Sequence, residues 1–355
     1  MKTTRITATL LLAAASLPTT LTAQRLVAID ANGAMAVVDK TTGALIPGAT
    51  VTPAVGTTSG LARDAVTGTA WVISSTNDAL YTLDIPSANT TLVGPFGDPA
   101  IVMHGLEWDS SSQTLFATSA HNGGLYGLDT ATGAATLIGL TGIPGFLNLA
   151  YDAADDVMFL TSSGTDALYT IDRATGAVTG VGPLSGPVSI NGLAWDSDLD
   201  VLWGVDNIQD QAYAIDQRTG RALSIGATAG NLLGLCYIAG GNGSVVRQEH
   251  GCGNTTIVVT GTPRPGGVVH TRLGNAVGVP LIGLGLLPRN TPFCTCTIGH
   301  EWSASFFGNT NMLAVPPGPA FVGVTVAVQG AAVFAPGGCA DPMVNLTDTL
   351  VVTIG

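Results

Sequence analysis

The sequence predicts an all-β protein, and three observations lead to this fold class. Only 10% of the 355 residues are charged, while 46% are hydrophobic. That balance excludes a coiled coil or helical bundle, and it excludes a disordered chain. The 47 glycines and 19 prolines interrupt helices and mark turns. Between these turn positions lie short runs rich in Val, Thr and aromatic residues, as is typical of β-strands.

The negative charge of the chain is confined to its first part. The whole sequence has 12 basic and 24 acidic residues, a balance that predicts no binding of nucleic acid. Residues 24–240 hold 20 of the acids and 6 of the bases, whereas residues 241–355 hold 4 of each. This change predicts a domain boundary near Gly240, between an acidic first domain and a neutral second domain.

Residues 1–23 have the pattern of a cleaved secretory signal peptide. Lys2 and Arg5 give a positive start, an apolar stretch follows from Ile6 to Leu17, and a polar run ends at Ala23. The apolar stretch is too short to span a bilayer, and no later stretch reaches the roughly 18 apolar residues of a membrane helix. We therefore expect a secreted or extracytoplasmic protein without a transmembrane segment. The alternative for this segment is a buried N-terminal helix.

Residues 25–240 contain an internal repeat with two anchor sequences. The first anchor reads GLARD, GLEWD, NLAYD, GLAWD and, in a degenerate copy, GLCYI; the copies begin at Gly60, Gly105, Asn148, Gly192 and Gly234. The second anchor is a hydrophobic run that ends at an aspartate, and its copies lie 45, 45, 43 and 44 residues apart, at Asp39, Asp84, Asp129, Asp172 and Asp216. Modules of about 40–45 residues with four short strands are typical of β-propeller blades.

The ends of the repeat predict the number of blades. Four complete modules run from Gly60 to Gly226. Three strand-like runs are left at the front, LVAID, AMAVVD and ATVTP, and one at the back, GLCYI. Joining these four strands makes a fifth blade from opposite ends of the array, which leaves no open edge. We therefore expect a five-bladed β-propeller at residues 24–240.

The aspartate that ends each first anchor is expected to hold the following turn. An aspartate at this point can accept hydrogen bonds from the turn backbone. The stretch Asp196–Asp200 alternates aspartates as a calcium loop does, but the neighbouring copies lack the alternation, and the glycine and glutamate of an EF-hand are missing. We expect a hairpin turn there.

After Asn242 the repeat ends and different strand-like runs follow. They read TTIVVTG, VVHTRL, VPLIGLGLL, FVGVTVAVQG and LVVTIG. In the fourth run, valines alternate with smaller or polar residues from Val322 to Gln329, which predicts a half-buried strand. About 110 residues of this kind predict a β-sandwich at residues 241–355.

Four of the five cysteines lie in the second domain: Cys252, Cys294, Cys296 and Cys339. In an exported chain such an even set predicts two disulfides. Cys294 and Cys296 point the same way on one strand, so we expect them to pair with the other two rather than with each other; the connectivity stays open. A metal site is the alternative, although Cys-x-Cys with scattered histidines fits tetrahedral spacing poorly.

The fifth cysteine, Cys236, stands inside a first anchor. The other copies carry an alanine or a glutamate at this position: Ala62, Glu107, Ala150 and Ala194. We expect Cys236 to be a free, packed thiol.

These motifs resemble two groups of exported proteins. The repeats, with GLAWD followed by LYTID and RATG, are similar to those of secreted bacterial propeller proteins that have no settled biochemical role. The second domain resembles one found at the C-terminal ends of exported proteins from planctomycete-type bacteria, on Gly251–Cys252, TPRPGG, VPLIGLG and LVVTIG. The resemblance implies a non-enzymatic binding or scaffold module at the cell envelope, with a protein or envelope component as partner. The second domain would serve sorting or attachment.

A ligand of such a propeller is expected on the face where the inner strands begin. The candidate residues on this face are His104, His121, Asn122, Asn148, Asn191, Asp206 and Asn207. We predict no catalytic residue and no cofactor, since neither a nucleophile elbow nor a phosphate-binding glycine loop is present.

An alternative function follows from a second resemblance. The sequence INGLAW followed by GVD is similar to a pattern in gluconolactonase-like propellers. That resemblance implies a calcium ion held by Asn191 and Asp206, with Asn148 and His104 as further ligands. A metal-bound water would then hydrolyse a lactone or ester. Three departures count against this alternative: that family has six blades, no glutamate opens an early blade here, and no second aspartate is placed to act as the base.

Overall fold

The computed structural model describes residues 25–240, 243–286, 288–317, 319–334, 339–340 and 343–355. The predicted signal peptide lies outside the described residues. Within them the protein is all-β, with one 3-10 helix, η1 (Pro319–Phe321), and no α-helix. No helix in the described ranges has the length and apolar character needed to cross a membrane.

The first twenty strands form antiparallel sheets of four strands each. One sheet joins both ends of the repeat: β20 (Leu232–Ile238), β1 (Arg25–Asp30), β2 (Ala34–Val38) and β3 (Leu45–Thr50). The next contains β4 (Thr58–Arg63), β5 (Ala70–Ser74), β6 (Ala79–Asp84) and β7 (Asn89–Pro95). A third contains β8 (Met103–Asp109), β9 (Thr114–Ser119), β10 (Gly124–Leu128) and β11 (Ala135–Leu140). The last two contain β12 (Leu147–Asp152), β13 (Val157–Ser162), β14 (Ala167–Ile171) and β15 (Val178–Pro183), then β16 (Ile190–Asp196), β17 (Val201–Asp206), β18 (Gln211–Ile215) and β19 (Ala222–Ala227).

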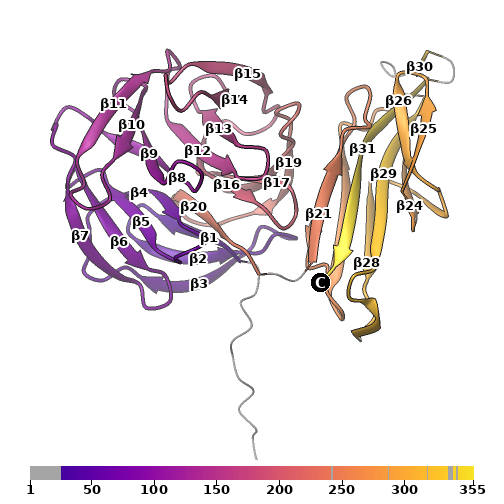
Figure 1. Ribbon diagram of the computed structural model, residues 1–355, viewed down its shortest axis with the longest axis horizontal. Coiled ribbons are helices and arrows are strands. Elements are labelled where there is room, and N and C mark those ends of the chain that lie inside the picture. Colours follow the sequence, from indigo (N-terminus) through magenta and orange to yellow (C-terminus); the bar gives the residue numbers. More distant parts are fainter. Residues whose placement is uncertain (1–24, 241–242, 287, 318, 335–338, 341–342) are drawn as a thin grey trace, which may run out of the picture.

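These sheets have a propeller-like arrangement (Figure 1). The strands that carry the first anchor lie side by side at the centre: β4 against β8, β8 against β12, β12 against β16, β16 against β20, and β20 against β4. The glycine in this anchor allows the close packing, because a Cβ at Gly234 would lie 3.0 Å from Leu61 Cβ of the neighbouring strand. The anchor sequences are therefore the inner strands.

The third strand at the front lies earlier than the sequence predicted. ATVTP was expected to form it, at residues 49–53, but β3 ends at Thr50 and includes Pro47 and Gly48. Only one side of this outermost strand is paired, to β2, and an edge strand tolerates proline and glycine. The expectation was wrong because it looked for β-branched residues only.

The aspartates at the ends of the inner strands hold the turns, as predicted. Asp64 accepts a hydrogen bond from the backbone N–H of Val66, and Asp152 accepts one from Ala154. In the same way, Asp109 accepts a hydrogen bond from the backbone N–H of Ser111, and Asp196 accepts one from Asp198. These Asx turns end four of the five inner strands at the same place, whereas β20 ends at Ile238.

The turn after Asp196 also links this sheet to its surroundings. The buried Asp196 carboxylate accepts from Lys40 Nζ at 2.7 Å and from the Trp203 indole at 3.1 Å. Asp198 accepts from the Tyr237 hydroxyl at 2.6 Å. The predicted hairpin turn is confirmed, and all three of its alternating carboxylates are engaged by protein groups, since Asp200 pairs with Arg247 at 3.6 Å.

A second glycine contact joins four of the five outer strands to the turn of the next sheet. A Cβ at Gly182 on β15 would lie 2.2 Å from the Thr219 carbonyl oxygen, which belongs to the turn before β19. The same contact recurs at three other joints: Gly94 with Thr132, Gly139 with Thr175, and Gly226 with Thr42. The Thr-Gly dipeptide of the repeat thus forms part of the contact between neighbouring sheets.

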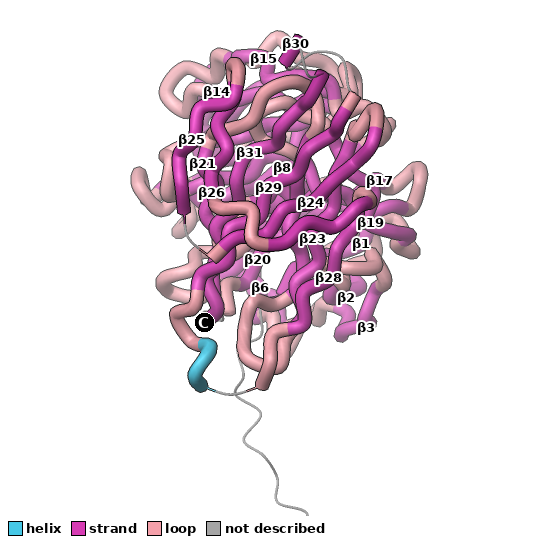
Figure 2. Tube along the Cα trace, turned by 90° about the vertical axis from the view of Figure 1, so that its right-hand side faces the viewer, coloured by secondary structure: helices cyan, strands magenta, loops and turns pink. Residues whose placement is uncertain are grey.

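The C-terminal part, residues 243–355, contains three sheets (Figure 2). The largest has the order β21-β31-β29-β24-β27, with β30 (Cys339–Ala340) paired to β31. Its other strands are β21 (Gly243–Gln248), β24 (Val279–Gly285), β27 (Ala304–Phe307), β29 (Thr325–Val333) and β31 (Met343–Ile354). The second sheet contains β22 (Thr256–Gly261), β23 (Val268–Gly274) and β28 (Thr310–Ala314), and the third contains β25 (Pro288–Phe293) and β26 (Cys296–His300). Strand β22 packs against β29 and β31, so the first two sheets form two layers.

The alternating run from Val322 to Gln329 is a strand only in part. Strand β29 begins at Thr325, and η1 ends just before Val322. Gly323 has a left-handed φ of 81°, which breaks the extended backbone that the alternation predicted.

The cysteines behave as the sequence predicted wherever the structure describes them. Cys252 and Cys296 form a disulfide with a Cα–Cα distance of 5.2 Å, and Cys294 is also disulfide-bonded. The side chain of Cys339 lies outside the described part. Cys236 is free and buried, as expected.

Candidate functional site

Three of the predicted ligand residues meet at one end of the inner strands. His104 on β8, Asn148 on β12 and Asn191 on β16 occupy the starts of adjacent strands, and all three are buried. Burial lowers the pKa of His104 to about 4, although the Leu147 backbone and the two asparagine side chains hydrogen-bond to it and oppose the shift. The imidazole is therefore neutral near pH 7.

An asparagine chain extends from this cluster. Asn191 Nδ2 donates to Asn207 Oδ1 at 2.5 Å, and Asn207 Nδ2 donates to Asn231 Oδ1 at 2.7 Å. His121 and Asn122 lie apart, in the exposed turn between β9 and β10. There Asn122 bonds the Tyr126 hydroxyl and the Gly124 backbone.

Asp206 holds a turn and the start of an inner strand. One carboxylate oxygen accepts from the backbone N–H groups of Val188 and Ser189, at 2.7 and 3.1 Å. The other accepts from Ile208 and Gln209, at 2.9 and 3.0 Å. A calcium ion at this carboxylate would compete with four backbone donors. No group of three His, Cys, Asp or Glu side chains within the described ranges could hold a metal. The predicted calcium site, like the expected lack of a cofactor, stays a prediction.

Apolar side chains of the inner strands line a small void between these strands. Leu61, Leu106, Leu149, Leu193 and Leu235 surround a void of about 10 Å³. A void of this size holds one water at most. The opposite end of the inner strands is formed by their last residues, such as Arg63, Asp109 and Asp152.

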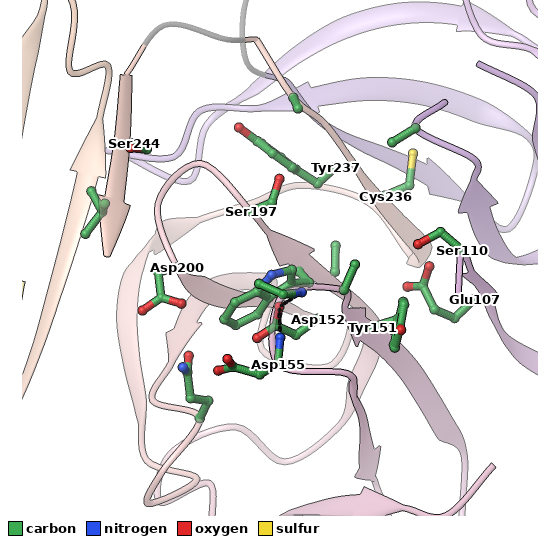
Figure 3. A pocket seen from close by; sticks show the side chains of 18 of the residues that line it. Glu107, Ser110, Tyr151, Asp152, Asp155, Ser197, Asp200, Cys236, Tyr237 and Ser244 are labelled. Carbon is green, nitrogen blue, oxygen red and sulfur yellow. Dashed lines mark hydrogen bonds between the residues drawn. The ribbon is translucent and has the colours of Figure 1, made fainter. Parts of the chain in front are cut away.

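A cavity of about 390 Å³ lies at that opposite end (Figure 3). Its walls come from the ends of the inner strands and from β21 of the C-terminal part. The residues that carry its chemistry are acids, two arginines and aromatic side chains: Glu107, Asp152, Asp155, Asp200, Glu249, Arg63, Arg247, Trp108, Tyr151, Trp195 and Tyr237. Ligand pockets typically have about 300–1,000 Å³. We call this space the basal cavity.

Glu107 is the most perturbed acid of the basal cavity. Desolvation raises its carboxyl pKa from 4.5 to about 8, with a smaller contribution from the nearby Asp109 charge. A hydrogen bond from the Trp108 backbone N–H, at 2.8 Å, opposes the shift. At pH 7 most molecules with an empty cavity therefore carry a protonated Glu107.

Cys236 faces the same cavity from β20. Burial raises the pKa of its thiol to about 12, and the Glu107 charge adds to this effect. A thiol with so high a pKa is a poor nucleophile. In Figure 3 the side chains of Cys236, Glu107 and Ser110 lie at one end of the cavity, and Asp200 and Ser244 lie at the other.

The two arginines compensate the acids only in part. Arg247 lies 3.1 Å from Asp348 and within 4 Å of Asp200 and Asp216. Its charge is therefore shared among three aspartates. Arg63 belongs to β4, where its charge acts on Asp64 and Cys236. The lining as a whole has five carboxyl groups and two guanidinium groups.

Four buried polar atoms of the lining have no hydrogen-bond partner among the described residues: Trp108 Nε1, Gln217 Oε1, Asp200 Oδ2 and Arg247 Nε. The last two face each other in an ion pair at 3.6 Å, whereas Trp108, only 9% exposed, and Gln217 have no such pairing. Buried polar groups are nearly always satisfied by protein, water or a ligand. The walls of the basal cavity are thus suited to polar contents.

The residues that the sequence predicts to bind a ligand, such as His104 and Asn191, lie at the other end of the inner strands from this cavity. A signal was nevertheless present, because Glu107 and Cys236 replace alanine in the first anchor. The repeat could not reveal that β21 forms one wall of the cavity, because β21 follows the repeat in the chain.

The fold and the site together define a propeller-like all-β protein with a ligand-sized cavity at one end of its inner strands. No family model matches the chain, and no curated protein matches it. The resemblances to secreted bacterial propellers and to a planctomycete-type domain therefore stay predictions.

Several solved structures are similar to the chain at low sequence identity. A crystal structure of a nidogen/laminin complex is 14% identical over 60% of this chain and 84% of that chain, with a TM-score of 0.44. A protein of unknown function from Bacteroides thetaiotaomicron is 16% identical over 62% and 72%, with a TM-score of 0.46. Virginiamycin B lyase from Staphylococcus aureus is 11% identical over 91% and 89%, with a TM-score of 0.40. At these values the similarities carry no inference about function.

Proposed function

We propose that the protein is a secreted, non-enzymatic binding module that holds a small molecule in the basal cavity. In this proposal the five inner strands form a closed five-bladed propeller, and the C-terminal part is a sandwich that serves sorting or attachment at the cell envelope. The observation that carries the binding function is the cavity of about 390 Å³ with polar and aromatic walls.

The chemistry of the lining favours binding over catalysis. Nucleophilic catalysis needs an activated side chain next to a base. The residues that line the cavity include no histidine, and the raised thiol pKa of Cys236 keeps it protonated. Glu107 has a raised pKa as well, but none of the serines in the lining hydrogen-bonds to it.

The proposal is tested by filling the cavity. The purified full chain is screened by thermal shift against small organic cations, neutral alcohols and sugars, and carboxylates. Ala239 is exposed and lines the cavity, so Ala239→Trp should occupy its space without disturbing the core. We expect compounds of one class to raise the Tm of the natural protein and to lose this effect in Ala239→Trp.

Ala174→Trp is the matched control, because Ala174 is exposed and does not line the cavity. It should bind as the natural protein does. A screen in which no class binds, or in which Ala239→Trp binds unchanged, would overturn the proposal.

A further inference from the structure

We propose that the basal cavity binds a small organic cation, a molecule with at least one protonated amine, and that Glu107 is its counter-ion. This inference rests on the proposed function and specifies the ligand of the same site.

Glu107 has no cationic partner among the described residues. The charges that act on its carboxyl group belong to Asp109 and Cys236, and the hydrogen bonds to this group come from the backbone of Trp108 and of Tyr151. A carboxylate in a desolvated site is stable when an opposite charge pairs with it. Since no side chain supplies that charge, a cationic ligand is the group that would complete the site.

The other charges of the cavity favour the same ligand. Asp152 and Asp200 are buried enough that desolvation raises their pKa values, and Asp155 and Glu249 are exposed at the cavity. Arg247 pairs with Asp200, but its positive charge is shared with two further aspartates. An anionic ligand would meet this acidic lining and be repelled.

The acidic side chains are spread through the basal cavity. Glu107 and Asp200 lie toward opposite ends of it in Figure 3, with Asp152 and Asp155 between the two. The unpartnered Gln217 Oε1 is an acceptor for an N–H donor. The unpartnered indole N–H of Trp108 is a donor that a ligand hydroxyl or an ordered water can satisfy.

Binding should also release a proton. The titratable and charged groups that face Glu107 are Arg63 on β4, Asp109 on its own strand, Tyr151 and Asp152 on β12, and Cys236 on β20. None of them is a cation paired to the carboxyl. An ammonium group at Glu107 lowers its pKa, so a carboxyl that is protonated in the empty cavity ionises when the cation binds.

The test uses three molecules of one shape. They are 1,5-diaminopentane, 1,5-pentanediol and pentanedioate, which are respectively cationic, neutral and anionic near pH 7. Calorimetric titration of the full chain at pH 7 should show binding of the diamine alone, with release of close to one proton per molecule bound. The proton is measured from the dependence of the binding enthalpy on the buffer.

Glu107→Gln should weaken the binding of the diamine about 10- to 100-fold and abolish the proton release. The matched control is Glu249→Gln, which removes the same charge from an exposed lining residue and should change the affinity no more than about twofold. Equal effects of the two variants would show attraction by the acidic surface in general and overturn the role of Glu107.

Two further outcomes separate this inference from the proposed function. If the diol or the dicarboxylate binds, and Ala239→Trp prevents it, the cavity is a binding site but its ligand is not a cation. If no molecule in either the screen or this set binds, the proposed function fails together with the inference.

Discussion

Single substitutions in a repeated position give the molecule its candidate site. The third residue of the first anchor is alanine in three copies, glutamate in one and cysteine in another. Alanine packs without polar groups, whereas Glu107 introduces an ionisable group with a pKa of about 8. Burying such a group without a partner costs stability. Glu107 therefore departs from the alanine that the packing favours, and the proposed binding function accounts for this departure.

The stability of the folded protein should depend on Glu107 as the pH rises. The pKa is 4.5 in the unfolded chain and about 8 in the folded protein, so the folded state binds more protons between these values. The contribution of Glu107 to stability is complete below about pH 4.5 and is lost as the pH rises through 8. Glu107→Gln has no such ionisation, and its free energy of unfolding relative to the natural protein should increase from pH 5 to pH 9.

This dependence is measured by urea unfolding of both proteins at pH 5, 7 and 9, without ligand. Glu249→Gln should follow the natural protein at each pH, because Glu249 is exposed. Parallel curves for the natural protein and Glu107→Gln would mean that Glu107 ionises in the folded state as it does in water.

At the scale of elements, a recurring backbone contact joins neighbouring sheets. The Thr-Gly turn of one sheet packs on a glycine in the outer strand of the sheet before it. A side chain on that glycine would overlap the carbonyl oxygen of the threonine in this turn. One of the two backbones would then have to shift. Glycine is therefore required there by the space between two backbones.

Two glycines of β15 make a matched test of this contact. Gly182→Ala would place its Cβ 2.2 Å from the Thr219 carbonyl oxygen, whereas Gly180→Ala would place its Cβ no nearer than 3.9 Å to Tyr169. Gly182→Ala should destabilise the protein by about 1–3 kcal/mol, measured by urea unfolding. Gly180→Ala should be neutral or stabilising by up to about 1 kcal/mol. Similar values for the two variants would contradict the proposed role of the contact.

Elements of the repeat could be predicted from the sequence because each feature recurs. The inner strands, the Asx turns and the pairing of β20 with the sheet of β1 all followed from copies compared with one another. The C-terminal part offers no second copy, and strands such as β27 (Ala304–Phe307) and β28 (Thr310–Ala314) have no continuous alternation to reveal them. The basal cavity was missed for the same reason: one of its walls, β21, comes from the part without repeats.

On the scale of the whole molecule, the two parts share one hydrophobic cluster. It includes Trp203 and Val205 of the propeller-like part together with Ile257 and Val352 of the C-terminal part. Arg272 on β23 also donates to the backbone carbonyl of Thr41 at 2.9 Å. The change of composition near Gly240 therefore marks the end of the repeat, but the hydrophobic cluster extends from one part into the other.

Arg247 is the residue through which this junction is best tested. Its side chain is only 6% exposed and lies within 4 Å of Asp200 and Asp216 on one side of the junction and of Asp348 on the other. Arg247→Met leaves these carboxylates without the shared charge, although Arg218 still lies 3.2 Å from Asp348. Removing one partner from a buried ion-pair network costs about 3–5 kcal/mol.

We expect the natural protein to unfold in a single calorimetric transition, since one apolar cluster spans both parts. In Arg247→Met the transition should move to lower temperature and separate into two, because the junction loses its charge pairing while each part keeps its own sheets. Arg289→Met is the control: Arg289 is 67% exposed and pairs with Glu301 at 4.0 Å, so its loss should cost less than about 1 kcal/mol. Two transitions in the natural protein would mean that the shared cluster does not couple the parts. The basal cavity would then depend on a wall, β21, that separates from the inner strands before they unfold.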